Sequence, residues 1–349
     1  MYFKILKSII KLLLPPIFTI IIKYFLSLFN KIKYSNLPFN NVEIIVKNKY
    51  YDLQYEYDAH NTWYQHGLSV KTYAGFNMKY KLPVRIEHGV YYFDIVNNNF
   101  INYDLAGMFV SSEFRKEIIM KYSKLEVTAI GPYIHYAKSL LKNFQFMKVK
   151  KKLGKTLLLM PSHSNVYTTP VRTNNDLFDT VKKICNDFDT IRACFHWHDI
   201  ENNLHLPYKN LGWDCVCAGH ERSHLFLSRL RSIFELSDFI VIEGMTTGIG
   251  YAIYLGKPLL LIDPKAEYNI TSLGIKDNNS NELYKKYDNN PASEEAFKVF
   301  SNYSDKITND QLQFVDKYNG LYSIKTKEEM RDLILYYESK LNKDKWKNN

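Results

Sequence analysis

The chain has 349 residues, of which 46% are hydrophobic, and it carries a formal net charge of +10. This length is too great for one compact core, so two domains are expected. A nucleic-acid-binding domain needs a basic stripe across its fold. Residues 1–42 hold six lysines and no acid, so they account for +6 of the net charge, and the other 307 residues carry only +4. Nucleic acid is therefore not expected as a partner. The four cysteines lie inside predicted helices and strands and are expected to be reduced thiols: Cys185, Cys194, Cys215 and Cys217.

Residues 1–36 are apolar and basic. The apolar run Leu12–Ile22 is broken by two prolines and closed by Lys23, so it is shorter than the roughly 20 residues of a membrane span. No small-residue cleavage site follows, which argues against a signal peptide. Lysines at positions 4, 7 and 11 share one helical face. The pattern predicts that residues 1–34 lie on an anionic membrane surface, and the alternative is a helix packed on the protein's own core.

Residues 37–150 are expected to form a first, Rossmann-like domain. Strand, helix and strand with glycine at the strand ends predict a parallel α/β sheet. Residues 49–80 show no clear period. Strands are expected at Val42–Asn48, Val84–Gly89, Ala106–Ser112 and Leu125–Tyr133, and a helix at Glu113–Tyr122. Residues 138–155, rich in lysine, are expected to be a solvated linker between domains.

Residues 151–349 are expected to form a second α/β domain. Its first strand, Lys155–Asn165, ends in Pro161-Ser162-His163-Ser164. Further strands are expected at Ile191–Asp199 and Trp213–His220, and helices at Asp176–Phe188, Leu225–Leu236, Ser293–Tyr303, Thr308–Tyr318 and Lys327–Leu341. Thr326 is the expected cap of the last helix. Residues 264–292 are expected to be a loop.

Two clusters in this domain have metal-ligand chemistry. In the expected strand Ile191–Asp199, Cys194, His196 and His198 alternate onto one face, but the strand period already explains their spacing. Cys215 and Cys217 are better explained as a packed thiol pair. No metal site is therefore predicted.

The segment Ser237–Asp263 is the most informative one. It predicts a strand at Phe239–Ile242, a helix at Ile249–Leu255 ended by Gly256, and a strand at Leu259–Ile262. Ligands bind at the carboxyl ends of such parallel strands, and helix N-termini hold phosphates. That edge presents the carboxylate of Glu243, which could accept from ribose hydroxyls, and the turn of Thr246, Thr247 and Gly248 with the amides up to Gly250. The alternative is an ordinary turn, with a threonine as N-cap and Glu243 solvated.

This segment resembles the donor site of GT-B glycosyltransferases. It is most similar to bacterial capsule and lipopolysaccharide transferases and to CDP-glycerol glycerophosphotransferase-like enzymes. The matching residues are Ser237-Asp238, Thr246-Thr247-Gly248, Ala252 and Leu255-Gly256-Lys257-Pro258. The turn departs from the Asp-Tyr-Ser-Ser of the glycerophosphotransferases, because Glu243-Gly244-Met245-Thr246-Thr247 stands there. A weaker resemblance extends over about residues 82–340.

The resemblance implies two Rossmann-like domains that face a cleft. It makes His88, in a His-Gly turn, the candidate general base, whereas without it a histidine that caps a strand end is the simpler interpretation. Glu87 and Asp94 are the fallback bases. The donor-binding candidates are Ser162, His163, His220, Arg222, Glu243, Thr246, Thr247 and Gly248. Arg222 could reach a phosphate or form an ion pair.

The expected function is transfer of a sugar or polyol phosphate from a nucleotide-activated donor to a growing cell-surface polysaccharide or lipid-linked glycan. Transfer is expected to be inverting and metal-independent, with no cofactor, at the cytoplasmic face of the cell membrane. The Asp187-Phe188-Asp189 triplet sits at a helix end, unlike the Asp-x-Asp of metal-using transferases. Two alternatives stay open: a non-hydrolysing UDP-sugar 2-epimerase, and a non-catalytic membrane-associated partner in a polysaccharide assembly complex.

Overall fold

The computed structural model describes residues 41–47, 56–94, 96, 101–164, 168–171, 176–264, 267–270 and 290–342. The membrane-contacting segment expected at residues 1–36 lies outside this part of the chain. Within the described part, no helix combines the length and the apolar character that crossing a bilayer requires.

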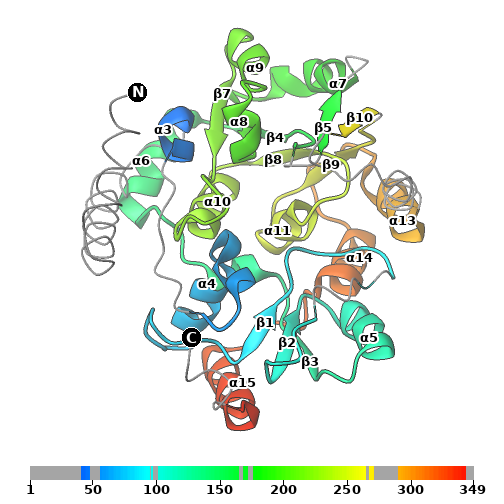
Figure 1. The fold of residues 1–349 in the computed structure, drawn as a ribbon. Coiled ribbons are helices and arrows are strands. Elements are labelled where there is room, and N and C mark those ends of the chain that lie inside the picture. The colour runs from blue at the N-terminus through cyan, green and yellow to red at the C-terminus, as the bar shows by residue number, and fades with distance from the viewer. Residues whose placement is uncertain are drawn as a thin grey trace.

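The larger sheet has five parallel strands in the order β7-β6-β4-β8-β9 (Figure 1). From the central strand β4 the chain moves outward through β6 to β7, then returns to place β8 on the other side of β4. Ligands of open α/β sheets bind at such a reversal point, beyond the carboxyl ends of the strands. The strands are β4 (Thr156–Met160), β6 (Thr190–Phe195), β7 (Asp214–Cys217), β8 (Phe239–Glu243) and β9 (Leu259–Ile262).

Both faces of this sheet are buried, as the near-continuous apolar strands require. In β4, Leu158 packs into one hydrophobic cluster, while Leu157 and Leu159 pack into another on the opposite face. The first cluster includes side chains of α10 (Phe226–Glu235), α11 (Gly248–Tyr254) and α13 (Pro291–Phe300). The second includes side chains of α3 (Val42–Lys47), α7 (Asp176–Ile184), α8 (Trp197–Glu201) and α9 (Leu206–Asn210).

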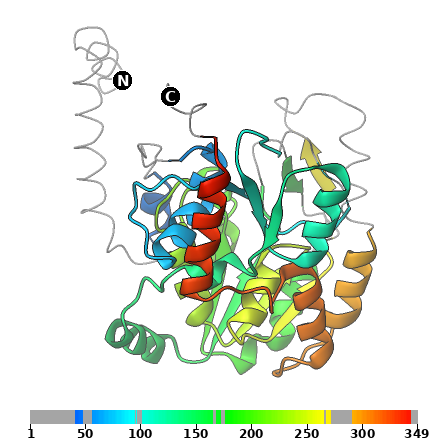
Figure 2. The same cartoon turned by 90° about the horizontal axis from the view of Figure 1, so that it is seen from below.

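The smaller sheet has three parallel strands, β1 (Val84–Ile86), β2 (Gly107–Val110) and β3 (Val127–Ala129). Helix α5 (Glu113–Tyr122) connects β2 to β3. The last helix, α15 (Lys327–Lys340), returns to this sheet, where the Tyr337 and Thr128 hydroxyls are hydrogen-bonded at 2.7 Å (Figure 2). The first hydrophobic cluster contains side chains of β1, β8 and α15, so the two sheets share a core.

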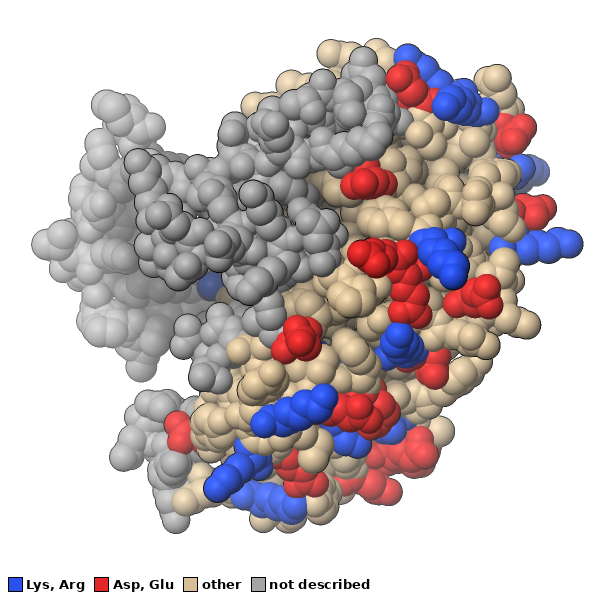
Figure 3. Space-filling model, turned by 90° about the vertical axis from the view of Figure 1, so that its right-hand side faces the viewer, with Lys and Arg blue, Asp and Glu red and all other residues tan. Residues whose placement is uncertain are grey.

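The remaining elements are shorter or peripheral. They are η1 (Ala59–Gln65), α4 (His66–Tyr73), η3 (Tyr133–Tyr136), α6 (Asn143–Leu153), η4 (Cys185–Asp187) and α14 (Asn309–Asn319), together with the antiparallel pair β5 (Thr168–Val171) and β10 (Glu267–Ile270). On the face that carries α5 and α13, acidic and basic side chains are interspersed (Figure 3).

Most predicted elements are confirmed. The strand, helix and strand of Ser237–Asp263 are β8, α11 and β9, and the predicted helix at Glu113–Tyr122 has the bounds of α5. Thr326 caps α15, accepting a hydrogen bond from the Glu329 amide at 3.2 Å. Cys215 and Cys217 are free and pack in the second cluster.

Four expectations are corrected. The strand predicted at Val42–Asn48 is wrong: residues 42–47 form helix α3, because the i, i+3, i+4 spacing of Val42, Ile45 and Val46 buries one helical face against α8 and β7. The strand predicted to reach Asp199 ends at Phe195, so His196 caps α8, and Cys194, His196 and His198 do not share a strand face as expected. The expected loop 264–292 contains β10, and the expected linker 138–155 contains α6.

Candidate functional site

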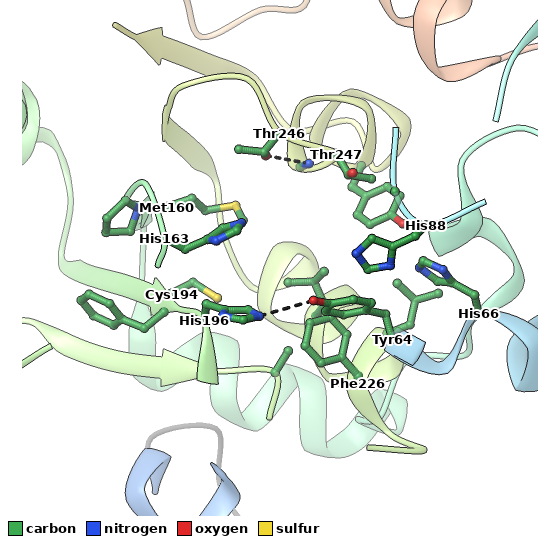
Figure 4. Close-up of a pocket in the computed structure, with 18 residues that line it drawn as sticks. Tyr64, His66, His88, Met160, His163, Cys194, His196, Phe226, Thr246 and Thr247 are labelled. Atoms are coloured by element: carbon green, nitrogen blue, oxygen red, sulfur yellow. Dashed lines mark hydrogen bonds between the residues drawn. The ribbon is translucent and has the colours of Figure 1, made fainter. Parts of the chain in front are cut away.

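A cavity of about 220 Å³ lies where strand ends of both sheets meet (Figure 4). Its lining comes from η1, the start of α4 and the turn after β1, from the carboxyl ends of β4, β6 and β7, and from α10, α11 and the turn between β8 and α11. The cavity therefore sits at the reversal point between β4 and β8, where the topology places a ligand. Five predicted site residues line it: His88, His163, Thr246, Thr247 and Gly248.

Direct hydrogen bonds join the turns that the two sheets contribute. The Val90 amide donates to Thr247 Oγ1 at 3.0 Å, and the Tyr92 hydroxyl donates to the Thr246 carbonyl at 2.9 Å. Gly89 has a φ of +73°, and a Cβ there would lie 3.1 Å from Thr247 Oγ1, so both conformation and space favour glycine. These contacts hold the His88 turn against the start of α11.

The threonine turn is preorganised by its own hydrogen bonds. Thr246 Oγ1 accepts from the Gly248 amide at 2.9 Å, and the Thr246 carbonyl accepts from the Ile249 amide at 3.2 Å. Thr246 thus has the local capping role that an ordinary turn would give it. An anionic ligand at this helix start would share these amides with Thr246.

His88 has the properties of a neutral base at physiological pH. Burial, together with smaller contributions from the nearby His60 and His163 rings, lowers its pKa to about 4. Its Nδ1 is buried and has no hydrogen-bond partner among the described residues. The Tyr64 ring lies against it, with ring centroids 4.7 Å apart. A neutral imidazole with an unused nitrogen can accept a proton.

Tyr64 is a cavity residue that the sequence did not indicate. It has a φ of +51°, in the left-handed region that non-glycine residues rarely adopt, and its amide donates to the Glu221 carbonyl at 2.6 Å. Its hydroxyl is hydrogen-bonded to His196 Nε2 at 3.4 Å, and its ring is nearly perpendicular to that of Phe226, with centroids 4.7 Å apart (Figure 4). Residues 49–80 show no period, so the only signal was their high content of aromatic residues and histidine.

The described lining of the cavity combines apolar side chains with histidines and hydroxyl groups. The lining residues that the structure describes include no lysine, arginine, aspartate or glutamate. Burial lowers the pKa of His66 to about 3 and holds the pKa of His196 well below its usual value. His163 stacks on His196, with centroids 4.9 Å apart. Such a lining suits a sugar or a nucleobase ring. Because it has no lysine or arginine, the negative charge of a bound diphosphate would be stabilised by the start of α11.

Four predicted donor-binding residues do not line the cavity. Glu243 and Ser162 are buried next to it, where the Ser162 amide donates to Glu243 Oε2 at 2.7 Å. This bond ties the end of β4 to the end of β8. The His220 ring packs on that of Trp197, with ring centroids 4.4 Å apart, and Arg222 is exposed.

The fallback bases also lie outside the lining. Glu87 is in a buried ion pair with Arg115 at 2.8 Å, and burial raises its pKa to about 7. Asp94 is exposed. In the described part of the chain, no group of three or more histidine, cysteine or carboxylate side chains has the geometry to hold a metal ion.

No protein-family model and no curated protein matches this chain. Among solved structures, the chain is similar to the wall teichoic acid polymerase TagF, with 14% identity, a TM-score of 0.39, and coverage of 76% of this chain and 69% of that one. It is also similar to S. aureus MnaA in complex with UDP, with 12% identity, a TM-score of 0.39, and coverage of 78% of this chain and 81% of that one. A third similar structure is the UDP-GlcNAc 2-epimerase from Neisseria meningitidis bound to UDP-GlcNAc, with 14% identity, a TM-score of 0.31, and coverage of 68% of this chain and 62% of that one.

Proposed function

We propose that this protein is a glycosyltransferase of the GT-B type that uses a nucleotide-activated donor. The observation that carries the proposal is the cavity at the reversal point of the five-stranded sheet, which the His88 turn of the other sheet also lines. The donor-site resemblance of Ser237–Asp263 falls on the turn that lines this cavity. The acceptor in the proposal is a growing cell-surface polysaccharide or a lipid-linked glycan, as the same resemblance implies.

In the proposed reaction, the acceptor hydroxyl attacks the anomeric carbon as the bond to the nucleoside diphosphate breaks. Neutral His88 takes the hydroxyl proton, and the leaving diphosphate keeps the bonding electron pair. Thr246, Thr247 and the start of α11 stabilise the charge that develops on the diphosphate. The proposal keeps the expected inversion, in which the hydroxyl attacks from the side opposite the leaving group.

The proposal needs no metal or cofactor. Hard cations such as Mg²⁺ prefer carboxylate and carbonyl oxygens, and no carboxylate lines the described part of the cavity. Charge stabilisation by hydroxyls and by a helix N-terminus serves instead. We also propose that residues 1–34 bring the enzyme to the cytoplasmic face of the membrane, which rests on their lysine and apolar pattern alone.

The test compares His88→Gln with His135→Gln. His135 is the matched control because its ring is hydrogen-bonded to Tyr254 and Tyr73, away from the cavity lining. Each protein, checked for folding by circular dichroism, is incubated with a panel of nucleotide sugars and bacterial membranes, and released nucleotide is measured by mass spectrometry. We expect release by the wild type and the control, and release at least about 100-fold slower by His88→Gln, the typical contribution of a general base.

Three other results would each contradict the proposal. His88→Gln at near wild-type rate would remove the assigned base. A sugar inverted at C2 while still attached to its nucleotide would identify a 2-epimerase. No release by the wild type, together with polymer synthesis in cells that needs residues 1–34 but not His88, would identify a non-catalytic partner.

A further inference from the structure

Helix α6 and its flanking residues form the most one-sidedly charged segment of the described chain. Residues 138–155 contain no acidic residue and seven lysines: Lys138, Lys142, Lys148, Lys150, Lys151, Lys152 and Lys155. By contrast, acids and bases alternate over the face that carries α5 and α13 (Figure 3). In both ribbon views α6 stands at the edge of the molecule, on the side away from α5 and α13 (Figures 1 and 2).

One side of α6 is anchored to the protein. Phe146, Val149 and Leu153 are partly buried and pack against the first hydrophobic cluster. Lys150 Nζ donates to the Gly154 and Leu236 carbonyls, each at 3.0 Å, and forms an ion pair with Asp238. These contacts fix the rotation of the helix about its axis and therefore determine which residues face away from the protein.

The outer side combines exposed apolar side chains with lysines. Phe144 is 74% exposed and Met147 is 64% exposed. Lys148 and Lys151, which follow at the i+3 and i+4 spacing of one helical face, are exposed as well. No residue of α6 is fully buried, so the core gains little from a phenylalanine and a methionine at these positions. An apolar pair within a basic face marks an interaction site.

We propose that this outer side of α6 docks on an anionic lipid bilayer. The lysines are attracted to anionic headgroups, while Phe144 and Met147 leave water for the boundary between headgroups and acyl chains. Duplex nucleic acid would also attract the lysines, but it would leave both apolar side chains in water. The surface is distinct from residues 1–34, and the inference does not rest on the proposed transfer reaction.

The test uses the full chain with phosphatidylcholine vesicles, prepared with and without phosphatidylglycerol. Hydrogen exchange measured by mass spectrometry is expected to slow across residues 143–153 only when phosphatidylglycerol is present. Each lysine near such a surface contributes about fivefold to the partition coefficient, so Lys148→Gln with Lys151→Gln should weaken binding about 25-fold. Phe144→Ser with Met147→Ser should also weaken it.

The matched control is Met120→Ser with Lys121→Gln on α5, where an exposed methionine and lysine lie on the other side of the molecule. This control should bind vesicles like the wild type. The proposal is overturned if the chain binds no vesicles, if exchange across α6 is unchanged on bound vesicles, or if the α6 variants bind like the control. Protection of α6 by duplex DNA but not by vesicles would assign the helix to nucleic acid instead.

Discussion

Lowering the pH from 7 to 5 should destabilise the protein through its buried histidines. A substitution of His66 tests this prediction. His66 is buried at the start of α4, with its ring 4.7 Å from that of Tyr133. Burial, together with a smaller contribution from the nearby His88, lowers its pKa to about 3. His88, with a pKa of about 4, behaves in the same way.

The sign follows from proton binding. Between pH 7 and 5 an unfolded histidine, with a pKa of about 6.5, takes up a proton, whereas His66 in the folded protein does not. The unfolded state therefore binds more protons, and the free energy of unfolding falls as the pH falls. Integration over this range gives about 2 kcal/mol for each such histidine, a large part of a typical total of about 5–15 kcal/mol.

The assay is urea unfolding of the wild type, His66→Phe and Phe109→Leu at both pH values. His66→Phe keeps a ring of similar size among aromatic neighbours, and it should lose about 2 kcal/mol less than the wild type between pH 7 and 5. Phe109→Leu is the control because it changes a buried side chain without removing a titrating group, so its loss should equal that of the wild type. Equal losses in wild type and His66→Phe would refute the reasoning from burial.

Three further predictions concern packing, capping and catalysis. Gly250→Ala should destabilise the protein by about 1–3 kcal/mol in urea unfolding, despite the better helix propensity of alanine, because its Cβ would lie 2.2 Å from the buried Asn319 Nδ2. Thr326→Ala should cost about 1 kcal/mol by the same measurement, because the Glu329 amide loses its acceptor. The pH profile of kcat/KM should show its acid limb near pH 4, with activity lost as the pH falls through the pKa of His88; a limb at the usual histidine value would show that the base is solvated or is another residue.

The elements that the sequence predicts well are those whose pattern is complete within a short stretch. Phe239–Ile262 contains two apolar strands, a helix and its stop signal, and the structure has all of them. Residues 42–47 show the opposite case. Their β-branched side chains favour a strand, but burial of Val42, Ile45 and Val46 against α8 and β7 selects a helix.

The cavity could be predicted only in part, for a related reason. His88 and Thr247 follow strands, so the topology of parallel sheets brings them to one edge. Tyr64 enters the cavity through a left-handed backbone conformation in a stretch without periodicity. Glu243 also follows a strand, yet its carboxylate accepts from the Ser162 amide next to the cavity, and no local pattern distinguishes these two orientations.

The most direct test of the central claim is whether this cavity binds a nucleotide. Isothermal titration calorimetry with CMP, CDP, UDP, GDP and ADP would compare the wild type with Thr247→Ala and with the control Thr72→Ala. The Thr72 hydroxyl donates to the Leu68 carbonyl on α4, outside the cavity lining. We predict that one nucleotide binds the wild type and Thr72→Ala alike and binds Thr247→Ala at least about tenfold more weakly, because a hydrogen bond to a charged phosphate is lost. Binding of no nucleotide, with or without added acceptor glycan, or equal binding to all three proteins, would contradict the account.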